Sequence, residues 1–172
     1  MKRTFIIFFI FFFHLNFLNA NTNIAFIDFN KVMLTSKPGS SIVSQLNDIS
    51  SKNKNKFESD AKTIKEQETK LISQKNILSE DDFQIKLNKL KLEIKNFNDN
   101  RNKINNNFNK LKIETTNKLL KLINPILVDY SNKKSISLIF QKKDLVIGKT
   151  EFDITDEVIK IINNDVKEFR IQ

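Results

Sequence analysis

The chain lacks the residues on which most enzymatic and metal-binding chemistry depends. Its 172 residues contain no cysteine, no tryptophan, two glycines, two prolines and a single histidine, His14. The absence of cysteine excludes disulfides, thiolate metal sites and thiol catalysis. With Gly39 and Gly148 as the only glycines, a phosphate-binding glycine-rich loop is excluded as well. We therefore expect no enzyme activity, no nucleotide, no metal and no other cofactor.

The first twenty residues have the pattern of a secretory signal peptide. Met1-Lys2-Arg3 is positively charged, residues 5–13 are an unbroken apolar run, and Leu18-Asn19-Ala20 offers a small residue at a cleavage point. The run is shorter than the roughly 20 residues that a bilayer span needs. An uncleaved anchor is the alternative. We expect cleavage of residues 1–20 and a mature chain without histidine.

Short strands are expected at both ends of the mature chain. Residues 24–29 are apolar and rich in β-formers, which predicts a buried strand. Two further apolar runs, 136–140 and 145–147, predict a β-hairpin, and Thr155 is expected to cap a final short helix. Because so few elements make only a small core, we expect the chain to associate with copies of itself.

Between the strands, apolar residues repeat at the 3.5-residue period typical of a coiled coil. The polar sequence Ser79-Glu80-Asp81-Asp82 separates two such series and has the spacing of a capping box. The pattern therefore predicts a long antiparallel helical hairpin with its tip near residues 79–82. Its predicted seam consists of Phe57, Ile64, Leu71, Leu78, Phe83, Leu90, Phe97, Ile104 and Leu111.

The predicted fold class is α+β, mainly α, with a helical arm inserted into a small body. Residues 21–39 and 132–172 would form the body, and residues 40–131 would form the arm. Ser36 is expected to cap the first long helix, and Pro125 is expected to kink or break the second.

Positive charge is concentrated on one arm of the hairpin. The formal net charge is +9, and +7 after removal of the signal; residues 40–82 carry −1 and residues 83–124 carry +7. A solvated helix face, nucleic-acid binding, and capture of acidic proteins or anionic lipid are the three interpretations. Three arginines against 26 lysines make nucleic acid the weaker of the binding interpretations. The candidate charged residues are Lys86, Lys89, Lys91, Lys95, Lys103, Lys110 and Lys112.

Four apolar residues near the tip fall outside the heptad seam: Ile72, Ile77, Ile85 and Leu92. Scattered exposed apolar residues are common on soluble proteins. Alternatively, beside the lysines, they offer the weak apolar contacts that hold an unfolded chain loosely.

Several segments together resemble the Skp/OmpH family of periplasmic chaperones. They are residues 24–32, Ser36-Lys37-Pro38-Gly39, Asn124-Pro125-Ile126, residues 136–140 and, above all, the D-I-T-D-E-V sequence from Asp153 to Val158. The resemblance implies a homotrimer in which strands of three chains interlock into a β-barrel body and three hairpins surround a cavity. It also implies ATP-independent binding of unfolded outer-membrane proteins in the periplasm. Oligomerisation contacts would then fall at Ile24, Phe26, Ile27, Ile136, Leu138 and Phe140.

Two other functions remain as alternatives. One is an extracytoplasmic coiled-coil spacer or adaptor. The other is a binder of anionic polymers, either lipopolysaccharide or nucleic acid, and lipid binding is compatible with a chaperone role.

Overall fold

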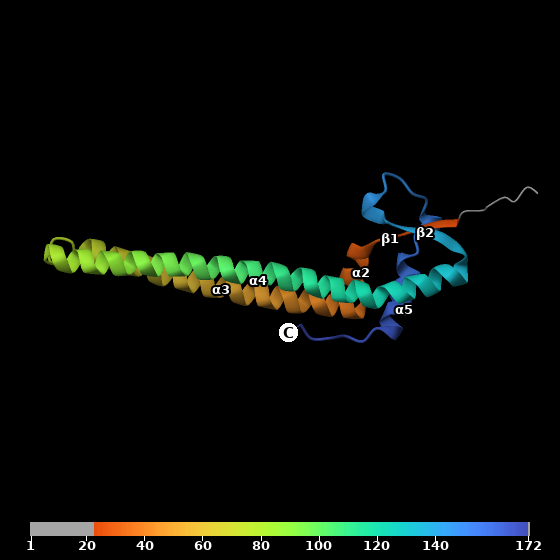
Figure 1. Cartoon of the computed structure of the whole chain (residues 1–172), viewed down its shortest axis with the longest axis horizontal. Coiled ribbons are helices and arrows are strands. Elements are labelled where there is room, and N and C mark those ends of the chain that lie inside the picture. Colours follow the sequence, from red (N-terminus) through yellow and green to blue (C-terminus); the bar gives the residue numbers. More distant parts are fainter. Residues whose placement is uncertain (1–22, 172) are drawn as a thin grey trace, which may run out of the picture.

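The computed structural model describes residues 23–171 and consists of a long helical arm attached to a small body (Figure 1). This confirms the predicted fold class; the predicted signal peptide lies outside the described residues. The elements in chain order are β1 (Asn23–Ile27), α2 (Phe29–Thr35), α3 (Lys37–Ser73), α4 (Glu80–Lys134), β2 (Ile136–Gln141), two 3₁₀ turns (Lys142–Asp144 and Thr150–Phe152) and α5 (Thr155–Asp165).

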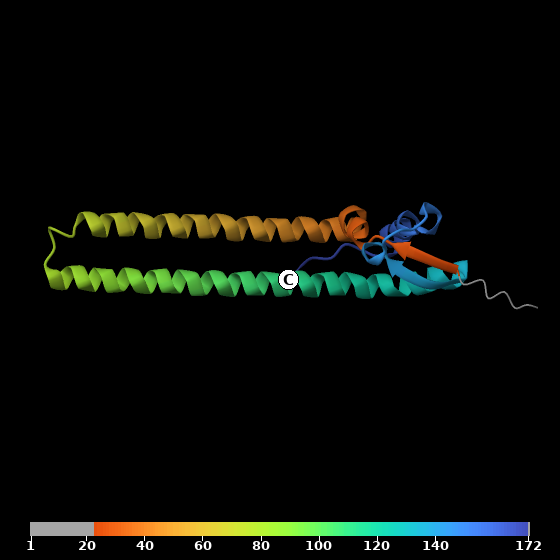
Figure 2. The ribbon, with the colours of Figure 1, turned by 90° about the horizontal axis from the view of Figure 1, so that it is seen from above.

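Helices α3 and α4 lie side by side in opposite directions and form the arm (Figures 1 and 2). The 55 residues of α4 span about 80 Å at 1.5 Å per residue. Of the nine predicted seam residues, Leu71 and Leu90 are buried and the other seven are partly buried, on an arm whose other residues are mostly exposed. This burial pattern is that of a narrow apolar seam between the two helices.

The tip of the arm lies a few residues before its predicted position. Helix α3 ends at Ser73, and the chain turns through residues 74–79, where the Leu78 amide donates to the Gln74 carbonyl at 3.0 Å. Leu78 is therefore part of the turn and not of a helix. The capping residues are as expected, since the Ser79 hydroxyl oxygen accepts from the Asp82 amide at 3.2 Å. A heptad period marks which residues face a partner, but it does not show where helical hydrogen bonding stops.

The start of α3 is held by the predicted cap. The Ser36 hydroxyl oxygen accepts from the Gly39 amide at 3.1 Å, and Pro38 occupies the first turn. A Cβ atom at Gly39 would come within 2.6 Å of the Met33 carbonyl oxygen. Only glycine therefore allows α2 and α3 to pack this closely at their junction.

A kink or a break was expected at Pro125; helix α4 continues through this residue, so the break is absent. Figure 1 shows that α4 changes direction in its C-terminal part, within the body. The helix ends at Lys134, and the capping residue Ser135 adopts a left-handed conformation with φ of 52°. From there the chain reverses into β2.

The two strands of the body pair in parallel, and the predicted β-hairpin is wrong. Strand β1 pairs with β2, and residues 145–147 form an irregular loop instead of a strand. Parallel strands need a long crossover, and here the crossover is the entire arm. The first strand also ends earlier than expected, because Asp28 caps α2 and Phe29 begins that helix.

The core lies where β1, α2, α3, α4 and α5 meet at the root of the arm. Its fully buried apolar members are Ile27, Val32, Ile42, Leu119, Ile123, Val158 and Ile162. Helix α5 begins with Thr155 at its first helical position, and the capping position is Ile154. The prediction that Thr155 caps α5 is therefore wrong, since its hydroxyl bonds to the Asp28 amide and the Asp153 carboxylate instead.

Candidate functional site

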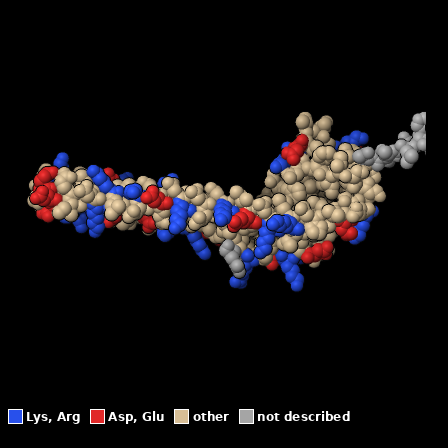
Figure 3. Space-filling view, viewed as in Figure 1, with Lys and Arg blue, Asp and Glu red and all other residues tan. Residues whose placement is uncertain are grey.

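The seven candidate lysines are all exposed along α4. Figure 3 shows basic side chains distributed along the arm, and acidic side chains gathered at its end. The acidic residues that begin α4 are Glu80, Asp81 and Asp82, which suit the positive end of the helix dipole. The arm therefore presents a short acidic tip followed by a long basic flank.

Most of the seven lysine charges are not neutralised by close acidic neighbours. Among the ion pairs of the described residues, the seven are represented only by Lys110, whose ammonium lies 3.8 Å from the Glu114 carboxylate. Lys86 donates a hydrogen bond to the Gln74 side chain at 3.3 Å. An exposed ion pair such as Lys110–Glu114 contributes little to the free energy of folding. The flank therefore projects a diffuse positive field into solvent.

A shallow cavity of about 320 Å³ lies between α3 and α4, close to the tip of the arm. Leu71 and Leu90 of the seam line it, together with Lys70, Lys86 and Lys89. The cavity thus combines an apolar floor with a rim that holds three lysines and one carboxylate, that of Glu93. Two of the seven predicted lysines, Lys86 and Lys89, belong to it.

The four apolar residues predicted to lie off the seam do point into solvent. Their exposed fractions are 65% for Ile72, 81% for Ile77, 67% for Ile85 and 57% for Leu92. Ile77 lies in the turn at the tip, and the other three lie on the last turns of α3 and the first turns of α4. The structure therefore brings exposed apolar and basic side chains together at the outer end of the arm.

One face of the β1–β2 sheet is apolar and partly uncovered. The register pairs Ile24 with Leu138 and Phe26 with Phe140, which places all four on the same face. Ile24, Leu138 and Phe140 are 43%, 52% and 42% exposed. A face of this kind is suited to contact with another chain.

Two predicted oligomerisation residues are already buried within the protomer. Ile27 is 1% exposed and belongs to the core, on the other face of the sheet. Phe26 is 6% exposed, because Gly148 of the loop after β2 packs against its ring. Ile136 is partly buried against the core. Ile27 and Phe26 therefore have almost no free surface for contact with another chain in this conformation, whereas Ile136 keeps part of its surface.

The loop after β2 holds exposed residues that the sequence pattern did not single out. Val146 and Ile147 are almost fully exposed, although their composition led us to expect a strand. Both residues are apolar and β-branched, and this composition led to the prediction that residues 145–147 pair with residues 136–140 instead of lying at the surface. They extend the apolar surface of the body.

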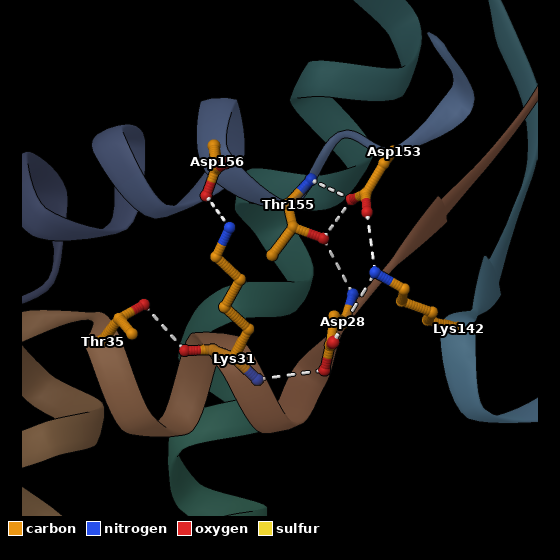
Figure 4. Close-up of polar contacts among 7 residues, drawn as sticks. All are labelled: Asp28, Lys31, Thr35, Lys142, Asp153, Thr155 and Asp156. Atoms are coloured by element: carbon orange, nitrogen blue, oxygen red, sulfur yellow. Dashed lines mark hydrogen bonds and ion pairs between the residues drawn. The ribbon is translucent and has the colours of Figure 1, made fainter. Parts of the chain in front are cut away.

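A polar cluster joins the junction of β1 and α2 to the start of α5 (Figure 4). The buried Thr155 hydroxyl accepts from the Asp28 amide at 2.9 Å and donates to the Asp153 carboxylate. Lys142 approaches the Asp153 carboxylate at 3.2 Å, and Lys31 pairs with Asp156 at 2.6 Å. These contacts give a physical role to the D-I-T-D-E-V sequence, since they connect both ends of the chain at the root of the arm.

The same cluster sets the ionisation of Asp153. Burial by itself raises the pKa of this carboxyl. Hydrogen bonds from the hydroxyl and the amide of Thr155, together with the Lys142 ammonium, outweigh burial and hold the pKa below its ordinary value. Asp153 is therefore a charged, fully bonded part of the fold rather than a poised acid or base.

The described residues offer neither a metal cluster nor a bilayer span. Within residues 23–171, no group of histidine, cysteine, aspartate and glutamate side chains is arranged to hold an ion. In the same range no helix combines the length and the apolar character that crossing a membrane requires.

Comparisons with known proteins agree with this architecture. A crystal structure of an OmpH-like protein from Caulobacter crescentus superposes with a TM-score of 0.75 at 11% identity, over 88% of this chain and 89% of that one. None of the curated proteins matches. The family model for outer membrane protein (OmpH-like) matches residues 23–162, which is nearly the whole described chain. The chain therefore belongs to the OmpH-like outer membrane protein family.

Proposed function

We propose that the chain is an ATP-independent holdase chaperone that keeps unfolded outer-membrane β-barrel proteins soluble in the periplasm. The observation that carries this proposal is the outer arm, where unpaired lysines and exposed apolar residues share one surface. The Caulobacter structure, described as a candidate outer membrane chaperone, supports the same role. Many weak contacts of this kind give affinity through multivalency and leave the client free to depart without a nucleotide cycle.

Electrostatics would govern capture. Residues 40–124 of the arm carry a formal charge of +6. This charge is spread over a length many times the Debye length of about 8 Å at physiological salt. Such a field steers an acidic unfolded chain toward the arms and raises the association rate. The exposed apolar side chains Ile72, Ile77, Ile85 and Leu92 would then slow release.

The proposed active form is a homotrimer. The partly exposed face formed by Ile24, Leu138 and Phe140 supports self-association, as does the small size of the sheet, which has two strands within residues 23–171. Three chains would place three basic arms around one space and multiply the weak contacts. The mass of the mature protein in solution tests this directly, and a monomer at working concentration contradicts it.

The test of the function is the fate of a denatured β-barrel protein diluted into buffer with the purified mature chain. We expect the barrel protein to stay soluble at a stoichiometric amount of trimer and to aggregate without it. Competition by lipopolysaccharide or DNA on the same preparation distinguishes a chaperone from a binder of anionic polymers. Aggregation that proceeds unchanged would refute the proposal.

The charge contribution is tested by replacing Lys86, Lys89, Lys91 and Lys95 with glutamine. We expect capture to slow about tenfold at low salt and to lose most of its salt dependence, as steered association does when charge is removed. The matched control replaces Lys52, Lys56, Lys65 and Lys75, which are also exposed but lie on α3 or in the tip turn. Equal slowing by both sets would show that total charge matters and that α4 has no special part.

A further inference from the structure

The C-terminal segment after α5 runs back along the root of the arm (Figures 1 and 2). Val166, directly after α5, adopts an extended conformation. Phe169 and Ile171 are partly buried against the core, whereas Glu168 and Arg170 are exposed. This alternation is that of a β-strand, yet the backbone here bonds to a side chain of α3. We call residues 166–171 the tail.

Gln45 of α3 recognises the backbone of the tail. Its side-chain nitrogen donates to the Phe169 carbonyl at 3.1 Å, and its side-chain oxygen accepts from the Ile171 amide at 3.0 Å. A carboxamide carries one acceptor and two donors, and one residue of a neighbouring strand likewise presents a C=O acceptor and an N–H donor on the same side. The pair thus imitates one bridge of a β-ladder, and it demands an extended backbone rather than particular side chains.

Side-chain contacts add a preference for an aromatic residue. The Lys118 ammonium of α4 lies 4.5 Å from the centroid of the Phe169 ring, within range of a cation–π interaction. Two residues further on, Ile171 packs against the core. The surface defined by Gln45, Lys118 and the core residues beneath the tail, which we call the tail site, therefore fits an aromatic residue followed at the second position by an aliphatic one.

This preference matches the chemistry of the clients in the proposed function. Transmembrane β-strands alternate apolar with polar residues over about ten positions and carry aromatic residues near the membrane interfaces. The tail itself, with Phe169, Arg170 and Ile171, has this pattern over its last residues. Gln45 and Lys118 lie within the family match of residues 23–162, whereas the tail lies beyond it.

We propose that the tail site binds one extended strand segment of an unfolded β-barrel protein, and that the tail occupies it as an intramolecular competitor. This inference rests on the proposed function, because it names the part of the client that is bound. The tail is held by two hydrogen bonds from Gln45, one cation–π contact and three partly buried side chains, Val166, Phe169 and Ile171. A client segment of alternating apolar residues can replace the Gln45 bonds and the contacts of Phe169 and Ile171. A tethered competitor weakens the binding of a client segment. The apparent dissociation constant equals the intrinsic one divided by the fraction of time that the tail is released.

A tryptophan reporter tests occupancy directly, because the chain has no tryptophan of its own. In Phe169→Trp the indole should replace the ring over Lys118 and emit as a partly buried side chain. Addition of a ten-residue peptide of alternating apolar and polar residues, with one phenylalanine, should shift the emission to longer wavelength and increase acrylamide quenching in a saturable manner. Arg170→Trp, at the neighbouring exposed position, should not respond, nor should Phe169→Trp respond to the same peptide with its apolar residues made contiguous.

Affinities for the same peptide, carrying a fluorophore, complete the test. Phe169→Ser should release the tail and tighten binding at least about tenfold relative to the unsubstituted chain. Gln45→Ala added to Phe169→Ser should remove that gain. A chain that ends at Val166 provides the same comparison if the serine variant loses helix content by circular dichroism.

Equal affinity in the unsubstituted and tail-released chains, or tight binding that does not depend on Gln45, would overturn the inference and leave the tail as a structural strap. Solubility of denatured β-barrel protein is measured on the same preparations. If the unsubstituted chain keeps the client soluble but the tail site fails these tests, only the inference is lost. If peptide binds at Gln45 but clients aggregate, the proposed function fails and the site stands as a strand-binding site.

Discussion

Replacing Thr155 with valine should destabilise the chain substantially, although the change exchanges only one oxygen atom for a methyl carbon. Thr155 is 1% exposed, and its hydroxyl links the end of β1 to the start of α5. Valine keeps the branched shape and nearly the same volume, so no cavity forms. What is lost is the acceptor for the Asp28 amide and one donor to the Asp153 carboxylate.

The magnitude follows from the two hydrogen bonds that the substitution removes. A buried amide without an acceptor costs about 1–3 kcal/mol, and a hydrogen bond to a charged group contributes about 1.5–3 kcal/mol. Asp153 keeps the Thr155 amide and Lys142 as partners, and its side chain is 19% exposed, so its share lies at the low end. We therefore expect Thr155→Val to lower the free energy of unfolding by about 2–4 kcal/mol.

Urea unfolding of the mature chain at one fixed protomer concentration measures this loss, because self-association would otherwise change the apparent stability. Thr35→Val is the matched control, since the Thr35 hydroxyl is exposed and donates only to the Lys31 carbonyl in its own helix (Figure 4). The control should change stability by less than about 0.5 kcal/mol. A loss for Thr155→Val no larger than that of Thr35→Val would refute the role assigned to the cluster.

The stability difference between the unsubstituted chain and Thr155→Val should also depend on pH. The pKa of Asp153 is lowered in the folded chain, so its contribution is present above the unfolded value of about 3.9 and is lost as pH falls through the folded value. Thr155→Val removes one cause of that lowering. The stability difference between the two chains should therefore be largest near neutral pH and shrink in acid; a difference that grows in acid would contradict this assignment.

Two further predictions concern single side chains. Burial, and then the 2.6 Å hydrogen bond to the Glu157 carboxylate, raise the pKa of Tyr130 to about 12; because it is the only tyrosine, ultraviolet titration should show one transition, and Glu157→Gln should lower it to a value still above 10. An unchanged transition would mean that the carboxylate has no effect. Gly39→Ala should lower the melting temperature more than Gly148→Ala, because the new methyl group meets the Met33 backbone oxygen at 2.6 Å in one case and the edge of a phenylalanine ring at 2.8 Å in the other. Equal melting temperatures would show that the α2–α3 junction can relax.

The arm and its caps could be predicted from the sequence because they depend on neighbours in the chain. The heptad period is a relation between residues three and four apart, and the caps at Ser36 and Ser79 are bonds across three residues. The exposed lysines and apolar residues of the outer arm follow from the same period. The position of the tip was wrong by a few residues, since the heptad count continued through Leu78 where the helix had already ended.

The arrangement of the body could not be predicted, because it depends on contacts between residues more than 100 positions apart. Composition favoured a hairpin of 136–140 with 145–147, the nearest partner in the chain. The core instead brings β1 beside β2 in parallel, and leaves the second run in a loop that covers Phe26. Thr155 resembled a helix cap locally, but its hydroxyl is satisfied by the Asp28 amide from the other end of the chain.

The sequence by itself determined that this protein has a long basic helical hairpin, where that hairpin begins, and which of its residues face inward, since a helix repeats every 3.6 residues whatever surrounds it. Only the tertiary structure decided how the two ends of the chain meet and what the last residues do. Nothing in the order of residues 166–171 indicates that Gln45 and Lys118 would hold them. Contacts of this kind arise from the packing of elements already formed, and their geometry is set by the whole core.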